Sequence, residues 1–252
     1  MIHRWFLGIG LFLLFAAVQL PASMLAPWVS EATSQRWRLS GVEGTLWHGR
    51  AVLSGIDRAS GRWQPGPHFQ WRIAGAELLR GRLVLQIHQD GGGSARMVAS
   101  LPAWRIAELD VGLPVSHIAS LLPGTLGEYG WAGTARLGGK EFSCRWSRLH
   151  CMGQLDLQWA NAAVAQLPGP VLGDVRVRVV GEGEALRIDL VTLRGRLHMS
   201  GTGELTAEVL RFSAEAEARG EGAAGLEAVL KAVGRPGTTP GRYLIDYREK
   251  LR

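Results

Sequence analysis

Strict alternation of apolar and polar residues, repeated over most of the chain, is the feature that most limits how this sequence can fold. The pattern is clearest in the segments QLDLQW (154–159), VRVRV (175–179), LRIDL (186–190) and LRFSAEAE (210–217). Successive side chains of a strand point to opposite faces, so this period predicts strands with one apolar face and one face in water. Parallel strands that are covered on both sides would be apolar throughout, so the pattern favours an antiparallel sheet.

The first such segment is GVEGTLWHGRAVLSG (41–55), in which Trp47, Ala51 and Leu53 fall on one side. Its W-x-G-x-A-x-L pattern returns at Trp131–Leu137, about 84 residues later. This recurrence suggests an internal repeat, with halves near 41–124 and 125–252.

The remaining segments complete a mainly β fold. The 34 glycines are spread between the alternating segments, which is typical of turns and bulges in a meander. In DRASGRWQPGPHF (57–69), the Pro-Gly-Pro of residues 65–67 predicts a break in regular structure. Short helices are expected at 114–124, with Val115, Ile118 and Leu122 on one face, and at 222–234, and a last strand at 242–248. The expected fold is a curved, mostly antiparallel β-sheet domain with one or two short helices.

The N-terminal segment predicts a membrane anchor. Residues 5–29 form an apolar stretch that is long enough to cross a bilayer as one helix, with Trp5 and Trp28 at its ends. His3 and Arg4 precede it, which favours residues 1–4 in the cytoplasm and residues 35–252 as an exported, periplasmic β-rich domain of a single-pass inner-membrane protein. The alternative is a cleaved signal peptide, but no A-x-A pattern marks a cleavage site near Ala22.

The two cysteines, Cys144 and Cys151, lie in EFSCRWSRLHC. In an exported chain they are expected to form a disulfide across a short hairpin or loop. A zinc site is the alternative, but it needs four ligands and only His150 is nearby.

The chain offers no pattern that indicates catalysis. Its seven histidines are scattered singly, and each is expected on the surface or in a strand. The G-x-G-x-x-G of residues 220–225 has Asp246 about 20 residues on, as in dinucleotide-binding folds. The strand before it is half charged, however, so a strand-to-helix turn is the better interpretation. The net charge of +6 comes from arginines that alternate along strands, which predicts a solvated face rather than nucleic-acid binding.

The apolar face of the sheet has two possible roles. Its side chains, including most of the 10 tryptophans, could fill a closed core. Alternatively, Leu83, Leu157, Val177 and Phe212 could line an apolar groove that binds or transfers a phospholipid.

The order of these parts resembles the type II secretion system protein N family (general secretion pathway protein N). The residues that carry the resemblance are the apolar segment, the motif Gly44, Thr45, Leu46, Trp47 and Gly49, and the C-terminal helix and strand with GRYLIDY (241–247). AsmA-like bridge proteins have similar glycine-rich strands.

The resemblance implies an accessory of the machinery that moves folded proteins across the outer membrane. Such a protein would be held in the inner membrane, would contact other type II secretion components, and would have no catalytic residues, cofactor or metal. The alternative function is that of a periplasmic lipid-binding or lipid-transfer module.

Overall fold

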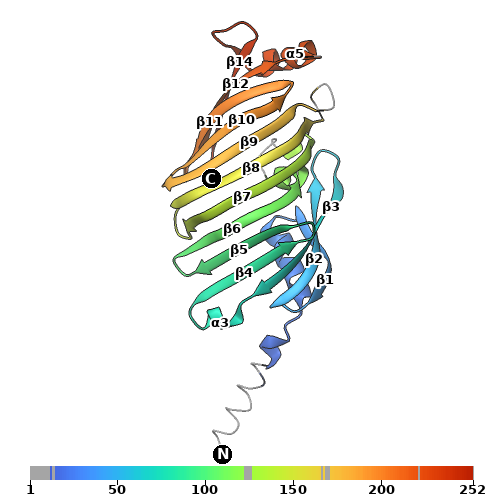
Figure 1. The fold of residues 1–252 in the computed structure, drawn as a ribbon, viewed down its shortest axis with the longest axis vertical. Helices are drawn as coiled ribbons and strands as arrows, with labels where there is room; N and C mark the ends of the chain where they lie inside the picture. The colour runs from blue at the N-terminus through green and yellow to red at the C-terminus, as the bar shows by residue number, and fades with distance from the viewer. Residues whose placement is uncertain are drawn as a thin grey trace, which may run out of the picture.

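The alternating segments are strands of one antiparallel sheet in a computed structural model, which describes residues 12, 15–121, 127–165, 167, 171–220 and 222–251 (Figure 1). Within these residues the sheet has 14 strands, and each pairs with the next in sequence, except that β14 lies between β12 and β13. The prediction of a mainly β, antiparallel meander is therefore confirmed. The strands are β1 (Trp37–Gly44), β2 (His48–Asp57), β3 (Arg62–Ile73), β4 (Arg82–Gln89), β5 (Gly93–Ser100), β6 (Ala103–Pro114), β7 (Trp131–Arg145), β8 (Cys151–Val164), β9 (Gly173–Gly183), β10 (Leu186–Gly195), β11 (Leu197–Leu205), β12 (Val209–Ala218), β13 (Arg235–Pro236) and β14 (Arg242–Lys250).

The helices of the described residues are few and short. They are the 3-10 helix η1 (Ala22–Met24), α2 (Leu25–Ala32), α3 (Gly75–Leu78), α4 (Val115–Ser120) and α5 (Ala223–Val233). Helices α4 and α5 occur within the two segments predicted to be helical. In α4, Val115 is buried and Ile118 is half buried, and Leu122 lies outside the described residues.

Helix α4 lies where the sheet curls. It packs against β2 and also against β7, two strands that are five apart in the sheet. Figure 1 shows β2 and β3 standing steeply against the direction of β4 to β9. The apolar faces of the first strands are thus turned onto α4, and Ala51 of β2 and Ala135 of β7 are buried. These alanines occupy equivalent positions in the two copies of the repeated sequence pattern.

His117 of α4 is fully buried, so the prediction that this histidine lies on the surface or in a strand is wrong. Its ring fits between Gly55 and Gly66. A Cβ atom on Gly55 would lie 2.6 Å from Cδ2 of the ring, and one on Gly66 would lie 2.6 Å from Cε1. Only glycine at these positions allows the helix to approach so closely.

The prolines of residues 65–67 do not break regular structure, which corrects the sequence-based expectation. They lie inside β3, where Pro65 pairs with Ser54 of β2 across a bulge. Strand β4 pairs with β3 only from Phe69 onward. The proline-containing part of β3 is therefore an edge, where the missing N–H groups cost no ladder hydrogen bond.

Of the predicted anchor at 5–29, residues 5–11, 13 and 14 lie outside the described residues. Where the chain is described, residues 15–18 are helical, Pro21 forms an isolated bridge with Thr45, and η1 and α2 follow. None of the helices in the described part of the chain has both the length and the apolar character that crossing a bilayer requires.

Beyond β7 the sheet is covered differently. Near the C-terminal end, α5 packs on β12 and β14, where Leu230 meets Ala216 and Tyr243. In the strands between, Leu157, Val177 and Leu190 follow one another in register across β8, β9 and β10. All three side chains are only half buried.

Candidate functional site

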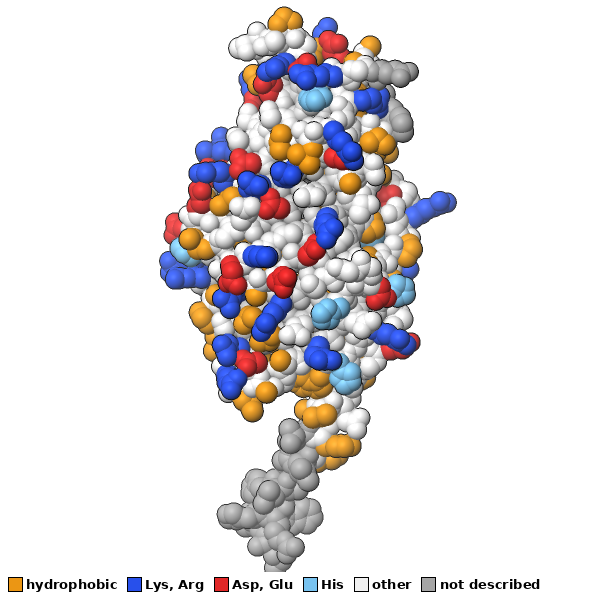
Figure 2. Space-filling view, viewed as in Figure 1, with side chains coloured by type: hydrophobic (Ala, Val, Ile, Leu, Met, Phe, Trp, Pro, Cys, Tyr) orange, Lys and Arg blue, Asp and Glu red, His pale blue; other side chains and the backbone are white. Residues whose placement is uncertain are grey.

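The polar face of the sheet carries matched pairs of arginine and carboxylate side chains. Figure 2 shows acidic and basic side chains close together over the central strands. Across β6 and β7, Nε and Nη2 of Arg136 each donate to one carboxylate oxygen of Asp110 at 2.6 Å. Similar cross-strand pairs join Arg178 to Asp156 at 3.1 Å and Arg194 to Asp174 at 2.5 Å. Opposite charges that face each other on neighbouring strands contribute to pairing.

These contacts hold the carboxylates in their charged form. The hydrogen bond from Arg136 lowers the pKa of Asp110. The backbone N–H of Asn161, followed by the guanidinium of Arg194, lowers the pKa of Asp174. A general acid needs the opposite shift, toward neutral pH. The arrangement therefore suits a structural surface better than acid–base chemistry.

The apolar face contains glycines that are covered by large side chains of the next strand. A Cβ atom on Gly203 would lie 2.8 Å from Cδ2 of Phe212, and one on Gly201 would lie 2.9 Å from Cζ of the same ring. In the same way, Trp71 covers Gly49, and Trp159 approaches Gly133. Gly49 and Gly133 are equivalent in the two copies of the repeated pattern. Aromatic side chains that cover glycines of a neighbouring strand shield the backbone there from water.

The four residues predicted to line an apolar groove share this face but do not form one cluster. Leu157 and Val177 are directly paired between β8 and β9. Phe212 lies on β12, three strands beyond β9. Leu83 lies on β4, four strands before β8, and is 39% exposed. Because strands are spaced by roughly 5 Å, Leu83 and Phe212 lie at widely separated places on the sheet.

The motif from Gly44 to Gly49 forms the turn between β1 and β2 and contacts the N-terminal segment. The indole N–H of Trp47 donates to the carbonyl of Ala17 at 2.8 Å, and the N–H of Leu46 donates to the carbonyl of Leu20 at 2.8 Å. The indole N–H of Trp71 donates in turn to the carbonyl of Leu46 at 3.0 Å.

Glycine is required at two positions of this motif for steric reasons. Gly44 has a φ of +93°, which L-residues with side chains rarely adopt. A Cβ atom on Gly49 would lie 2.5 Å from Cζ2 of Trp71. Sequence reasoning singled out the motif but did not reveal that it joins the sheet to residues 17–21.

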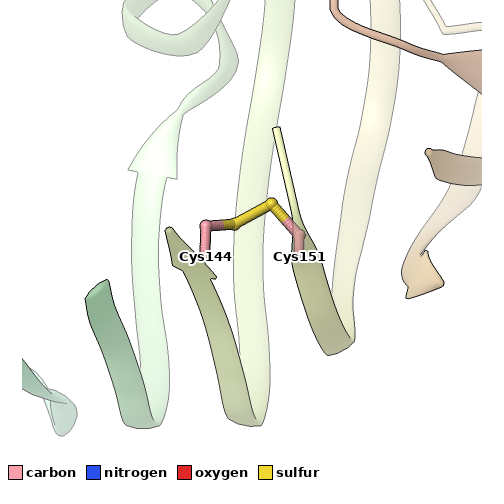
Figure 3. Close-up of a disulfide and its surroundings, with 2 residues drawn as sticks. All are labelled: Cys144 and Cys151. Atoms are coloured by element: carbon pink, nitrogen blue, oxygen red, sulfur yellow. A yellow bond between two sulfur atoms is a disulfide. The ribbon is translucent and has the colours of Figure 1, made fainter. Parts of the chain in front are cut away.

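Cys144 and Cys151 form a disulfide between β7 and β8, with an S–S distance of 2.03 Å and a Cα–Cα distance of 4.1 Å (Figure 3). The two residues are paired in register beside the hairpin that connects these strands. They pack against Phe142, with Trp104 and Leu155 around them.

The glycine-rich segment 220–225 leads into α5, with Gly222 as its N-cap. Asp246, the residue at the position of a ribose-binding carboxylate, accepts hydrogen bonds from Ser213 at 2.6 Å and from Arg235. Ser213, followed by Arg235, lowers the pKa of Asp246. This carboxylate therefore belongs to the polar face of the sheet.

Sequence reasoning missed one charged feature. Arg211 of β12 lies directly opposite Arg248 of β14. Both line a groove of about 820 Å³ on the polar face, together with Arg187, Glu204, Ser213 and Asp246. Register alone could have revealed the pair, but register cannot be read from a single sequence.

Comparison with known proteins gave one match. The family model for "Type II secretion system (T2SS), protein N" matches residues 35–245, which run from just before β1 into β14. The search of curated proteins and the search of solved structures gave no match.

Proposed function

We propose that this chain, which belongs to the type II secretion system protein N family and so has a role in type II secretion, fulfils that role through contacts with other proteins rather than by catalysis. The observation that carries the proposal is the extent of the family match, which includes almost the whole sheet. The ion-paired carboxylates support the non-enzymatic part, because arginine and backbone donors keep them charged and poorly suited to proton transfer.

The proposed location is the inner membrane, with the anchor at 5–29 and the β-rich domain at 35–252 in the periplasm. The apolar composition of residues 5–29 supports this topology. Large apolar side chains within that segment, including Phe12, Phe15 and Trp28, are exposed, and Trp28 is 74% exposed. Such side chains are stabilised by a lipid environment. The proposed architecture is bridge-like, similar to AsmA-like proteins, because a single curved sheet offers a long surface to partners.

The function is tested by deleting the gene and measuring exoproteins in the periplasm and the medium. We expect exoproteins to accumulate in the periplasm, and a plasmid copy of the wild-type chain should restore their release. Unchanged secretion in the deletion strain would contradict the proposed role.

Contact through the sheet is tested by photocrosslinking in living cells. A photoreactive residue at position 157 would face the apolar side, and one at position 158 would face the polar side, one residue away in the same strand. We expect at least one of the two positions to crosslink to another secretion component. Crosslinks to phospholipid alone, at position 157, would instead support the lipid-binding alternative.

A further inference from the structure

The two edges of the sheet differ in how they are protected. Edge strand β1 packs against α2 and has an irregularity between Ser40 and Glu43, where Gly41 has a φ of +59°. Covering helices and bulges are the usual ways in which proteins prevent an edge from pairing with another chain. At the other end, β13 pairs with β14 only at Leu244 and Tyr243.

The direction of the hydrogen bonds shows which main-chain groups of β14 are free. Arg242 uses both its N–H and its carbonyl on the side away from β12, because its N–H donates to Thr239 and its carbonyl accepts from Gly237. Main-chain groups of alternate residues in a strand point to the same side. The N–H and carbonyl groups of Asp246, Arg248 and Lys250 therefore point outward. Within the described part of the chain, none of these groups has a hydrogen-bond partner.

The charges beside this edge are unbalanced. Arg187, Glu204, Arg211 and Arg248 follow one another in register across β10, β11, β12 and β14. The signs alternate until Arg211 meets Arg248, and like charges directly opposite each other are destabilising. Because the main-chain groups of Arg248 point outward, this is a non-hydrogen-bonded pair, in which side chains lie closest. An acidic residue on a further strand would face Arg248 and continue the alternation.

We propose that the outer edge of β14, residues 246–250, binds an extended acidic segment of another secretion component, which adds a strand to the sheet. The added strand would place acidic side chains beside Arg248 and Lys250 on the polar face and apolar side chains beside Ile245 and Tyr247. Only the identity of the partner as a secretion component rests on the proposed function. A second copy of this chain fits less well than an acidic segment, because the antiparallel register that sets Lys250 beside Asp246 brings Arg248 against Arg248.

The edge can be tested with the full chain purified in a neutral detergent and a fluorescent eight-residue peptide of alternating valine and glutamate. We expect this peptide to bind at least about tenfold more tightly than a peptide of alternating valine and lysine. Amide hydrogen exchange at Asp246, Arg248 and Lys250 should slow when the glutamate peptide is bound. Equal binding of the two peptides, or unchanged exchange at these amides, would overturn the proposal.

A pair of charge-reversal variants distinguishes an effect of the β14 edge on peptide binding from an effect of the overall net charge. Arg248→Glu should weaken binding of the glutamate peptide by about tenfold or more. Arg145→Glu changes the net charge equally but lies on β7, an exposed position between two paired strands, and should leave binding unchanged. Equal effects of the two variants would overturn the proposal. It would also be overturned if the wild-type chain dimerised and Arg248→Glu abolished this dimerisation, because the edge would then bind a second copy.

The same variants distinguish this proposal from the proposed function. If deletion of the gene stops secretion but Arg248→Glu restores it as well as the wild type does, the edge proposal fails and the role in secretion stands. If deletion leaves secretion intact, the role fails, whatever the peptide does.

Discussion

Leu53 on β2 and Leu190 on β10 are both apolar residues of alternating strands, yet their surroundings differ. Leu53 is 7% exposed, in a strand that packs against α4, whereas Leu190 is half buried on β10, which packs extensively only against its neighbouring strands among the described residues. The sequence pattern is the same in both regions. The comparison shows that alternation determines which side chains share a face, whereas the insertion of one six-residue helix determines whether that face becomes a core.

The largest expected effect tests this difference directly. Leu53→Ala should lower the free energy of unfolding by about 2–4 kcal/mol, because it leaves a cavity in a packed region. Leu190→Ala should cost only about 1 kcal/mol, because its side chain is already partly in water. Chemical denaturation of both variants checks the difference. Equal losses would show that the second region is as well packed as the first.

Close packing around His117 gives the next largest effect. Gly55→Ala should cost about 1–3 kcal/mol, because the new methyl group would overlap the imidazole. The matched control is Gly138→Ala on β7, where the nearest neighbour of the new Cβ, the carbonyl oxygen of Leu109, lies 3.9 Å away. Thermal denaturation should show a lower midpoint for Gly55→Ala than for the control. A reversed order would contradict the placement of α4.

The disulfide lies where the two regions meet, on the hairpin between β7 and β8. Replacing both cysteines with serine should cost about 2 kcal/mol, because the closed loop is short. Alkylation of the exported protein without reductant should leave Cys144 and Cys151 unmodified, as detected by mass spectrometry. Labelling of both residues would show that the bond is absent.

The buried histidine should make the helix-covered region sensitive to acid. Burial lowers the pKa of His117, although its hydrogen bond to the carbonyl of Gln64 acts in the opposite direction. The unfolded chain then binds a proton more readily than the folded chain, so stability is full above about pH 6.5 and falls as the pH is lowered below that value.

Unfolding curves at pH 7.5 and pH 5 measure this effect. The difference in stability between the two values should be smaller in His117→Gln, whose amide N–H can still donate to Gln64. An identical difference in the variant would assign the acid sensitivity to other groups.

The smallest effect is expected on the polar face. Arg136→Ala removes a pair with Asp110, but the Arg136 side chain is 65% exposed, so the cost should stay below about 1 kcal/mol. Added salt should weaken the wild type slightly more than the variant. A loss as large as that of Leu53→Ala would mean that the polar face stabilises the sheet as much as the core does.

Local sequence was sufficient for the strands and for the positions of α4 and α5, because period and flanking residues are visible along the chain. It was insufficient where the outcome depends on distant partners. The strand through Pro65 is possible because β4 does not extend that far along β3. The burial of His117 depends on Gly55 and Gly66, which in sequence look like any other strand glycines.

The candidate sites also include features that are visible in local sequence and features that depend on distant partners. The motif around Trp47 could be recognised from sequence, but its contact with Ala17 could not, because a turn glycine or tryptophan does not indicate its partner. The opposition of Arg211 and Arg248 could be found only from the register of β12 and β14, which are separated in sequence by α5 and β13.

The hydrogen bonds from Trp47 and Leu46 to Ala17 and Leu20 have a mechanical consequence. These bonds attach the N-terminal segment to the sheet at several points, whereas the peptide chain alone would attach it at one. The sheet therefore cannot rotate freely about residue 21. If the segment that ends at Leu20 tilted, these bonds would turn the β1–β2 hairpin with it. The bond from Trp71 to Leu46 would pass the movement on to β3. A rotation at the first hairpin would then be carried across the continuous sheet to β14 at its opposite end.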